Sequence, residues 1–290
     1  MGFWADLRFR ERPPSPIMQC PEAPRVSTPD PTRPFTKPMR LSPLALLFIL
    51  ACSSPSDDTP PTTAVEEGSS GDAAYRLRTW GSMMEVLRNG ETQGRVALSE
   101  VSGPHVIGVG ALEQLSGELT IDGGQAHVTA VSGTDLLFPE TGPDSKATLL
   151  AVAEVEQWQE ITLPAIANLR DLEEAIATQA AENGIDTSAI PALPFRVEGD
   201  FEGLCLHVLN GSCPIANPDG PEPWRLTDAK ATGVLVGFFA ENAAGKLTHH
   251  GQRSHTHAIV TTAAGDEAGG HVDDTRVAAG ATLFLPKSER

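Results

Sequence analysis

The segment 254–272, SHTHAIVTTAAGDEAGGHV, holds three of the chain's eight histidines around one turn. Side chains alternate faces along a β-strand, so His255 and His257 project from the same side of an extended segment. The β-prone residues 258–262 and the glycine-rich residues 264–270 predict a hairpin whose returning strand begins at His271. Three imidazoles on one patch match the ligand set of a catalytic zinc, which keeps a position open for water or substrate.

Two interpretations of this hairpin stay open. Either its three histidines bind a first-row transition metal, or it is a surface hairpin whose histidines are incidental. The spacing alone does not distinguish zinc from the neighbouring metals. The other nearby histidines, His249 and His250, adjoin Gly251 and are expected to be solvated loop residues.

The composition excludes one class of partner and favours one class of structure. The formal net charge is -17 and the pI is about 4.8, so the chain offers no basic face to nucleic acid. Hydrophobic residues make up 40%, enough for a core, whereas aromatic residues make up only 5% and glycine and proline are abundant. Strands and loops fit this composition better than a helical bundle does.

The N-terminal region predicts an exported lipoprotein. Residues 1–38 are rich in proline and arginine without hydrophobic periodicity, and we expect a disordered upstream extension that precedes a true start at Met39. Residues 39–52 combine a basic start, a short apolar run and Cys52, which is typical of a bacterial lipoprotein signal and its lipid-attachment cysteine. The apolar run is too short for a membrane span. We expect lipid anchoring to a bacterial membrane, at the outer membrane, the cell surface or the periplasmic side.

A linker and one folded region are expected after the signal. Residues 53–74 are dominated by Ser, Pro, Thr, Asp and Gly, which cannot bury enough apolar surface to become ordered. The folded domain is expected to span 75–290. Because an exported chain meets an oxidising compartment, Cys205 and Cys213 are predicted to form a disulfide. Two free cysteines, or a zinc half-site formed by Cys205 and His207, are the alternatives.

Periodicity within the expected domain indicates a mixed α+β order. A short amphipathic helix is predicted over 79–90, and a longer one over 169–182, with Asn168 as its N-cap and Gly184 after its end. A hairpin turn is expected at Asp122-Gly123-Gly124. The expected strands are 106–109, 117–121, 126–130, 195–201 and 232–239.

Several segments, taken in order, resemble one protein family. They read WGSMMEVLRNGETQGRVALSEV, GVGALEQLSGELTIDGG, LPFRVEGDF, TGVLVGFFA and HTH followed by GGHVDD. This set is similar to the α-acetolactate decarboxylases. The resemblance implies two β-rich halves, a mixed sheet and an antiparallel sheet, with packed helices and a metal site between them. It also implies a homodimer and a zinc ion held by His255, His257 and His271.

The resemblance further implies a reaction and two catalytic residues. Members of the family convert 2-acetolactate, a 2-hydroxy-3-oxo acid, to acetoin and carbon dioxide, with zinc as a Lewis acid. Glu118 matches the family's active-site glutamate, and Arg196 matches an arginine suited to holding the substrate carboxylate. Without the resemblance, Glu118 is only a carboxylate near a turn, and Arg196 is a candidate for surface pairs with Glu198 and Asp200. Asp274 either orients an imidazole or caps a turn.

Two departures from the family keep other functions open. The turn between the histidine strands is longer than is usual, and the chain ends at LPKSER, where typical members continue and return another glutamate to the metal. Glu289 is the candidate to replace that glutamate. The alternatives to acetolactate decarboxylation are another zinc lyase or hydrolase reaction on a small oxo acid, and a non-catalytic surface lipoprotein that binds a metal or ligand.

Overall fold

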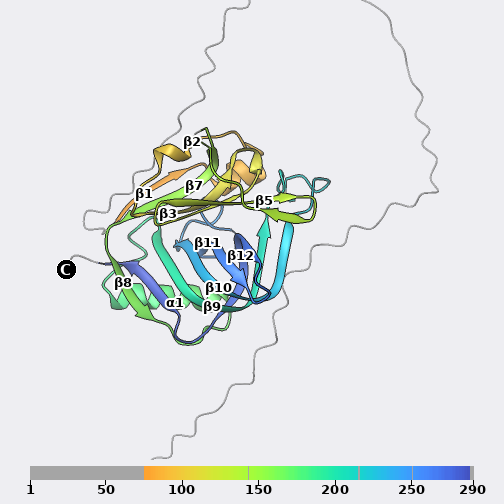
Figure 1. Cartoon of the computed structure of the whole chain (residues 1–290). Helices are drawn as coiled ribbons and strands as arrows, with labels where there is room; N and C mark the ends of the chain where they lie inside the picture. Colours follow the sequence, from red (N-terminus) through yellow and green to blue (C-terminus); the bar gives the residue numbers. More distant parts are fainter. Residues whose placement is uncertain (1–74, 143, 215, 250, 288–290) are drawn as a thin grey trace, which may run out of the picture. The chain divides into compact units, whose positions relative to one another are not determined.

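The computed structural model describes residues 75–142, 144–214, 216–249 and 251–287. Within them, two antiparallel β-sheets pack against each other, and Figure 1 shows the first sheet above the second. The first sheet has the strand order β1-β7-β3-β4-β5-β6, with β2 paired to β7. Its strands are β1 (Tyr75–Trp80), β2 (Val96–Ala97), β3 (Val106–Leu112), β4 (Glu118–Asp122), β5 (Gln125–Ser132), β6 (Asp135–Leu137) and β7 (Lys146–Val155).

The second sheet has the order β10-β11-β12-β9-β13-β8. Its strands are β8 (Trp158–Thr162), β9 (Leu193–Val208), β10 (Trp224–Phe239), β11 (Ser254–Thr262), β12 (Glu267–Val277) and β13 (Thr282–Pro286). Strands β9 and β10 also pair with each other, so β9, β10, β11 and β12 close into a ring of hydrogen-bonded strands. Both edges of β9 are therefore paired, one with β10 and the other with β12, the strand that carries His271.

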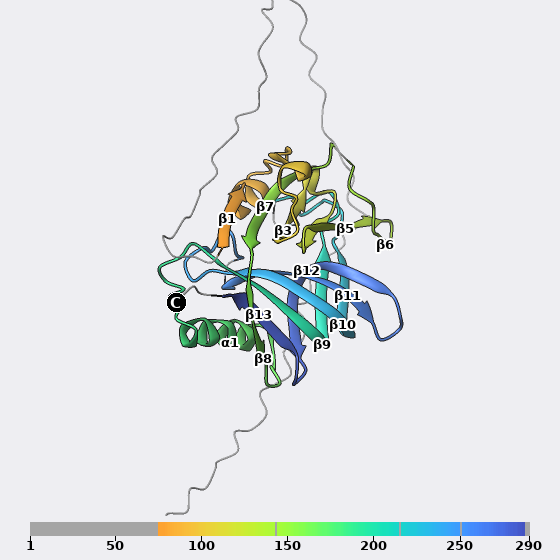
Figure 2. The ribbon, with the colours of Figure 1, turned by 60° about the vertical axis from the view of Figure 1, so that its left-hand side comes forward.

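The helix α1 (Leu169–Glu182) covers one side of the second sheet, beside β8 and β13 in Figure 2. The Asn168 side chain accepts a hydrogen bond from the Asp171 amide at 2.9 Å and caps the helix, as its position before the apolar periodicity predicts. Gly184 follows the end of the helix with a positive φ of 76°, a conformation that favours glycine. Three short helical turns lie elsewhere in the described part of the chain, η1 (Met84–Arg88), η2 (Leu98–Glu100) and η3 (Glu113–Leu115).

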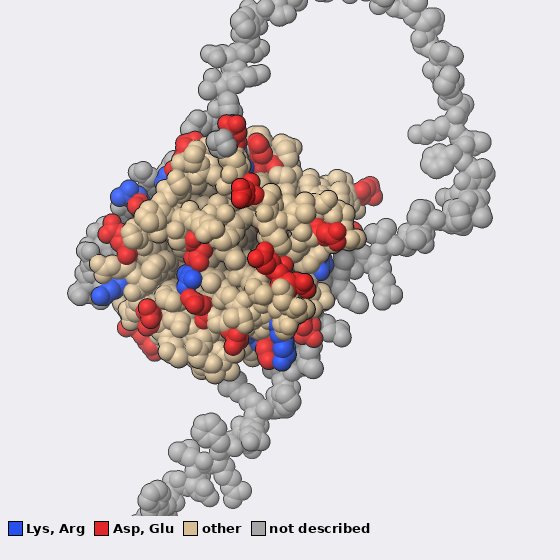
Figure 3. Space-filling view, viewed as in Figure 1, with Lys and Arg blue, Asp and Glu red and all other residues tan. Residues whose placement is uncertain are grey.

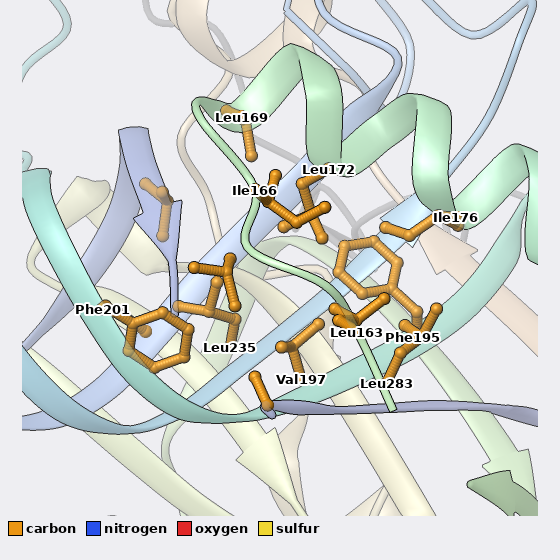
Figure 4. Close-up of a cluster of buried hydrophobic side chains, with 14 of the residues drawn as sticks. Leu163, Ile166, Leu169, Leu172, Ile176, Phe195, Val197, Phe201, Leu235 and Leu283 are labelled. Atoms are coloured by element: carbon orange, nitrogen blue, oxygen red, sulfur yellow. The ribbon is translucent and has the colours of Figure 1, made fainter. Parts of the chain in front are cut away.

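The larger core lies between α1 and the second sheet. Figure 4 shows Leu172 and Ile176 of the helix pointing towards Phe195 and Leu283 of the strands. These side chains are fully buried, and full burial of a large apolar side chain contributes about 1.5–3 kcal/mol. The helix therefore covers the face of the second sheet that points away from the first sheet.

A separate apolar layer joins the two sheets. Ile107 and Val109 of β3 pack with Val236 and Phe238 of β10. Since side chains alternate along β10, these two β10 residues lie on the opposite face from Leu235, which belongs to the core under α1. In the register, His257 pairs with Val236 and His255 pairs with Phe238, so both histidines share the face that meets the first sheet.

The predicted α+β class with packed helices is wrong. Both sheets are antiparallel, including the one expected to be mixed, and the described residues contain a single α-helix. The helix expected over 79–90 forms only the π-helical turn η1, because β1 extends through Trp80, which pairs with Leu150 of β7. Gly81 ends that strand at a φ of 67°, where an added Cβ would lie 2.5 Å from the Thr148 carbonyl oxygen.

Most of the remaining predicted elements over the described residues are confirmed, but the strand that returns His271 begins earlier than expected, at Glu267. The expected strands correspond to β3, β4, β5, β9 and β10, with β4 beginning one residue later than expected, and the turn Asp122-Gly123-Gly124 joins β4 to β5. Acidic side chains are scattered over the face in Figure 3 and outnumber basic ones there. None of the described helices combines the length and the apolar character that a membrane span requires. The predictions for the extension, the signal, Cys52, the linker and Glu289 fall outside the described residues.

Candidate metal centre

The hairpin of β11 and β12 brings the three predicted ligands together. His257 and His271 lie directly opposite each other in the ladder, and His255 lies two residues earlier on the same face. One ligand atom from each of the three histidines lies within 4.8 Å of the others. All three side chains are buried, with exposed fractions of 3%, 0% and 3% for His255, His257 and His271.

The imidazoles are in the state that a metal requires. Burial lowers the pKa of His257 from its usual value to about 3, and burial holds the pKa of His255 and of His271 well below the usual range. All three rings are therefore neutral near pH 7, with a lone pair to offer. Neutral imidazole is a common zinc ligand, and three protein nitrogens leave one position open.

The hydrogen bonds around the rings fit a metal between them. The Nε2 atoms of His255 and His257 lie 3.1 Å apart, so the two rings converge on one point. On the far side of its ring, His257 Nδ1 meets Thr120 Oγ1 at 3.3 Å, which leaves Nε2 for the metal. His255 Nδ1 is buried and has no hydrogen-bond partner among the described residues. The residues therefore fit a divalent metal held by the three imidazoles, towards which the Nε2 atoms of His255 and His257 converge.

The two glycines before His271 explain how β12 reaches this position. A Cβ on Gly269 would lie 2.5 Å from Thr129 Oγ1 of the first sheet. A Cβ on Gly270, whose φ is 128°, would lie 2.7 Å from the carbonyl oxygen of His207. Because glycine alone tolerates both approaches, the Gly-Gly pair lets the strand pass close to β5 and β9.

Glu118 of β4 reaches the histidines from the other sheet. Its Oε2 lies 3.8 Å from His257 Nε2, and its Oε1 accepts a hydrogen bond from the Leu209 amide at 3.2 Å. Burial raises the pKa of the Glu118 carboxyl, while the nearby His207 acts in the opposite direction. Burial thus favours the neutral form of both Glu118 and His257. A carboxyl group whose pKa is raised beside a metal site is suited to holding and passing a proton.

Arg196 lies on the same face but is already paired. Its Nε contacts Asp122 Oδ1 at 3.0 Å, its Nη1 contacts Glu198 Oε2 at 2.9 Å, and its guanidinium lies over the Phe284 ring. Across the ladder, Arg196 pairs with Val236, which pairs with His257. The structure therefore places Arg196 two strands from the histidines and gives it an inter-sheet ion pair with Asp122 that the sequence did not predict. Within the described part of the chain, Nη2 makes no hydrogen bond.

Two further histidines adjoin the triad. His207 of β9 pairs directly with His271, and their ring centroids lie 4.8 Å apart. Its Nδ1 lies 2.8 Å from Asp273 Oδ1, and Arg225 Nη1 lies 3.1 Å from the other oxygen of Asp273. His249, expected to be a solvated loop residue, is partly buried, and its ring centroid lies 4.8 Å from that of His271. In the sequence, Cys205 and His207 suggested a zinc half-site that includes the cysteine. The structure instead places His207 beside His271 of the histidine triad.

For Asp274 and Cys213, the structure favours the alternatives to a role at an imidazole and to a disulfide between Cys205 and Cys213. Asp274 Oδ1 accepts a hydrogen bond from the Leu169 amide at 2.8 Å and so caps α1 rather than orienting an imidazole. The predicted disulfide between Cys205 and Cys213 is not formed, since Cys213 is a free and buried thiol. Cys213 packs in an apolar cluster with Leu115 and Leu209, whereas Cys205 lies within the extended strand β9.

Comparisons with known proteins agree with this fold. The fold is similar to the crystal structure of alpha-acetolactate decarboxylase from Bacillus subtilis strain 168, at 17% identity and a TM-score of 0.52, over 73% of this chain and 85% of that chain. It is also similar to a Staphylococcus aureus protein of unknown function described as similar to alpha-acetolactate decarboxylase, at 16% identity and a TM-score of 0.54, over 72% and 84% of the two chains. The comparison with curated proteins gave no match.

The sequence profile described as alpha-acetolactate decarboxylase matches residues 80–287. This range holds the histidine hairpin, Glu118 and Arg196, and it covers most of the chain. The chain belongs to the α-acetolactate decarboxylase family, a family of carboxy-lyases.

Proposed function

We propose that the protein is a zinc-dependent decarboxylase that converts 2-acetolactate to acetoin and carbon dioxide. The observation that carries the proposal is the convergence of three neutral, buried imidazoles, one of which, that of His257, lies 3.8 Å from the buried carboxyl group of Glu118. Three nitrogen ligands with an open position form the donor set of catalytic zinc sites. Membership of a carboxy-lyase family makes acetolactate the first substrate to test.

His255, His257 and His271 would hold the zinc, which when bound would supply Lewis-acid stabilisation of negative charge on the substrate oxygens. The bond that breaks joins the substrate's carboxylate carbon to its hydroxyl-bearing carbon. The electron pair of that bond moves into the adjacent carbonyl group as carbon dioxide leaves. A proton must then be added to the hydroxyl-bearing carbon, which has lost the carboxylate, to give acetoin.

Glu118 is the residue proposed to deliver that proton. Its carboxyl group is buried and faces His257, and the Leu209 amide fixes one of its oxygens. Burial raises its pKa, so it holds a proton more readily than an exposed glutamate does. The second oxygen is the one on the side of the histidines, which is where a substrate on the metal would lie.

Arg196 is proposed to attract the substrate carboxylate through the part of its guanidinium that the ion pairs leave available. A planar guanidinium has five N–H donors, and Asp122 and Glu198 use two of its three nitrogens. These two acids also favour an alternative in which Arg196 mainly joins the sheets. In that case the zinc site would act on another small oxo acid, by a related lyase or hydrolase reaction.

Lipid attachment at Cys52, export to the outer membrane or the cell surface, and homodimer formation are also part of the proposal. Support for the first two comes from the signal-like residues 39–52 alone. The homodimer is supported by the family resemblance.

Release of carbon dioxide from racemic acetolactate by the zinc-loaded protein tests the proposed reaction. The proposal expects acetoin and carbon dioxide in equal amounts and no product from protein treated with a chelator. A zinc-loaded protein that forms no acetoin would favour the alternative reactions or the non-catalytic binding protein.

A further inference from the structure

A buried carboxylate of α1 contacts the strand that carries two of the histidines. Glu173 has an exposed fraction of 3%. Its Oε1 accepts a hydrogen bond from the Arg253 amide at 2.8 Å and another from Ser254 Oγ at 2.8 Å. The next residue in the chain is His255. The contact therefore fixes β11 at its first residue, immediately before the first ligand.

The contact with Glu173 lies on the face of β11 opposite to the metal site. Ser254 and His255 are neighbours in an extended strand, so their side chains point to opposite faces. Ser254 faces α1, and His255 faces the first sheet. Among the described residues, the hydrogen bonds and the ion pair of Glu173 go to Arg253 and Ser254 and not to the three imidazoles, so its influence on them passes through β11.

The other ligand strand is joined to the same part of the helix. Asp274 of β12 accepts hydrogen bonds from the Leu169 amide at 2.8 Å and from the Thr275 amide at 2.9 Å. Asp274 follows His271 closely along the chain. The N-terminal half of α1 thus holds β12 just after His271 and β11 just before His255, so the helix spans the base of the histidine hairpin.

Burying a carboxylate costs free energy unless hydrogen bonds and ion pairs satisfy its oxygens. A leucine would fill a similar space in an apolar core without that cost. Glu173 accepts two hydrogen bonds through one oxygen, and its other oxygen lies 4.0 Å from Arg253 Nε. The adjacent Glu174 instead makes an exposed ion pair with Arg253 Nη2 at 2.9 Å. The two acids therefore contact the same residue, but only Glu173 holds the backbone.

We infer that Glu173 is a positioning residue for the metal site, which sets the place of His255 Nε2 by fixing the start of β11. The inference rests on the proposed metal site. A group that orients a ligand from outside the coordination sphere affects metal affinity by about 10–100-fold when it is removed. Glu173 contacts the two residues that precede His255 rather than its ring, so the lower end of that range is expected.

Glu173→Leu is the main variant, because leucine fills a similar space but accepts neither of the two hydrogen bonds, whereas the oxygen of a glutamine could still accept both. Glu174→Gln is the matched control, since it removes a charge from the same helix and from the same arginine. Ser254→Ala removes one donor and leaves the Arg253 amide in place. Circular dichroism of each metal-free protein establishes that it is folded before metal is added.

Two readouts separate positioning from general stability. Zinc affinity is measured by chelator competition well below the melting temperature, and the visible spectrum of the cobalt-substituted protein reports the ligand geometry directly. Glu173→Leu is expected to weaken zinc binding about 10-fold and to change the cobalt spectrum. Glu174→Gln is expected to match the wild type in both readouts.

Unchanged zinc affinity and an unchanged cobalt spectrum in Glu173→Leu would overturn the inference while leaving the metal site intact. A wild type that binds neither zinc nor cobalt would instead overturn the proposed metal site, and the positioning role with it. If Glu173→Leu does not fold, Ser254→Ala decides in its place. A wild-type cobalt spectrum in folded Ser254→Ala would then count against the positioning role.

Discussion

Glu118 and His257 come from different sheets, and their side chains meet with Oε2 and Nε2 3.8 Å apart. Thr120 lies two residues after Glu118 on β4, on the same face, and its Oγ1 lies 3.3 Å from the other ring nitrogen of His257. Strand β4 therefore contacts both sides of one imidazole. The candidate site depends on how the two sheets pack, because neither sheet holds both the three histidines and the carboxyl group.

Glu118→Gln is expected to separate chemistry from metal binding. The amide keeps the shape of the side chain, but it cannot hold and release the proton that the product requires. We expect zinc content to match the wild type and turnover to fall about 10²-fold or more, the scale of a positioned general acid. Acetoin formation and zinc content are measured on the same preparation.

Glu160→Gln is a suitable control, because Glu160 lies exposed on β8, away from the histidine strands. It should leave both readouts unchanged. Wild-type turnover in zinc-loaded Glu118→Gln would contradict the role given to Glu118.

Arg196→Lys and Asp122→Asn together test whether Arg196 supports activity by binding the substrate or by pairing with Asp122. Lysine keeps the charge but not the planar pair of donors, so we expect kcat/KM to fall about 10-fold or more, as for the loss of one charge-assisted hydrogen bond. Asp122→Asn leaves the guanidinium in place. Since a partly exposed ion pair contributes about 0–1 kcal/mol, this second variant should lose little stability and little activity.

Steady-state kinetics and thermal unfolding of both variants give the comparison. If Asp122→Asn loses as much activity as Arg196→Lys, the arginine acts mainly by joining the sheets. Substrate binding by Arg196 would then be the wrong interpretation.

Cys213 should react as a free thiol that the fold protects. It is buried in an apolar cluster, so iodoacetamide should not label it in the native protein. Labelling should occur in denaturant without any reductant, and peptide mass spectrometry would identify the site. A Cys213 that becomes reactive only after reduction would be in a disulfide, contrary to the structure.

Cys52 is expected to carry a lipid when the full-length chain is produced in a bacterial host. The thiol is the attachment point that the signal-like segment 39–52 predicts. Metabolic labelling with a fatty acid should mark the wild type, which should partition with membranes, whereas Cys52→Ser should remain unlabelled. An unlabelled wild type found in the cytosol would refute both the anchor and the export.

Local patterns predicted the histidine hairpin well. Alternation placed His255 and His257 on one face, and the turn returned His271 opposite His257. The same kind of local information predicted α1, since an Asn cap and a glycine stop act within a single turn. Residues close together in the sequence determine these features, so they can be predicted from a single sequence.

The parts that sequence reasoning missed depend on contacts between distant residues. His207 lies beside His271 because β9 pairs with β12, and Arg196 meets Asp122 because two sheets pack. Apolar spacing over 79–90 favoured a helix, but pairing of β1 with β7 carried its first residues into a strand. Tertiary pairing overrode local propensity in that segment, which contributed to the wrong α+β assignment.

The zinc content of the purified protein, compared between the wild type and His271→Ala, tests the central claim most directly. About one zinc per chain is expected in the wild type, as in sites with three protein ligands, and most of it should be lost in the variant. His249→Ala is the control, since His249 adjoins the triad but does not belong to its ligand group, and it should keep its zinc. Full zinc occupancy in His271→Ala would contradict the hairpin site.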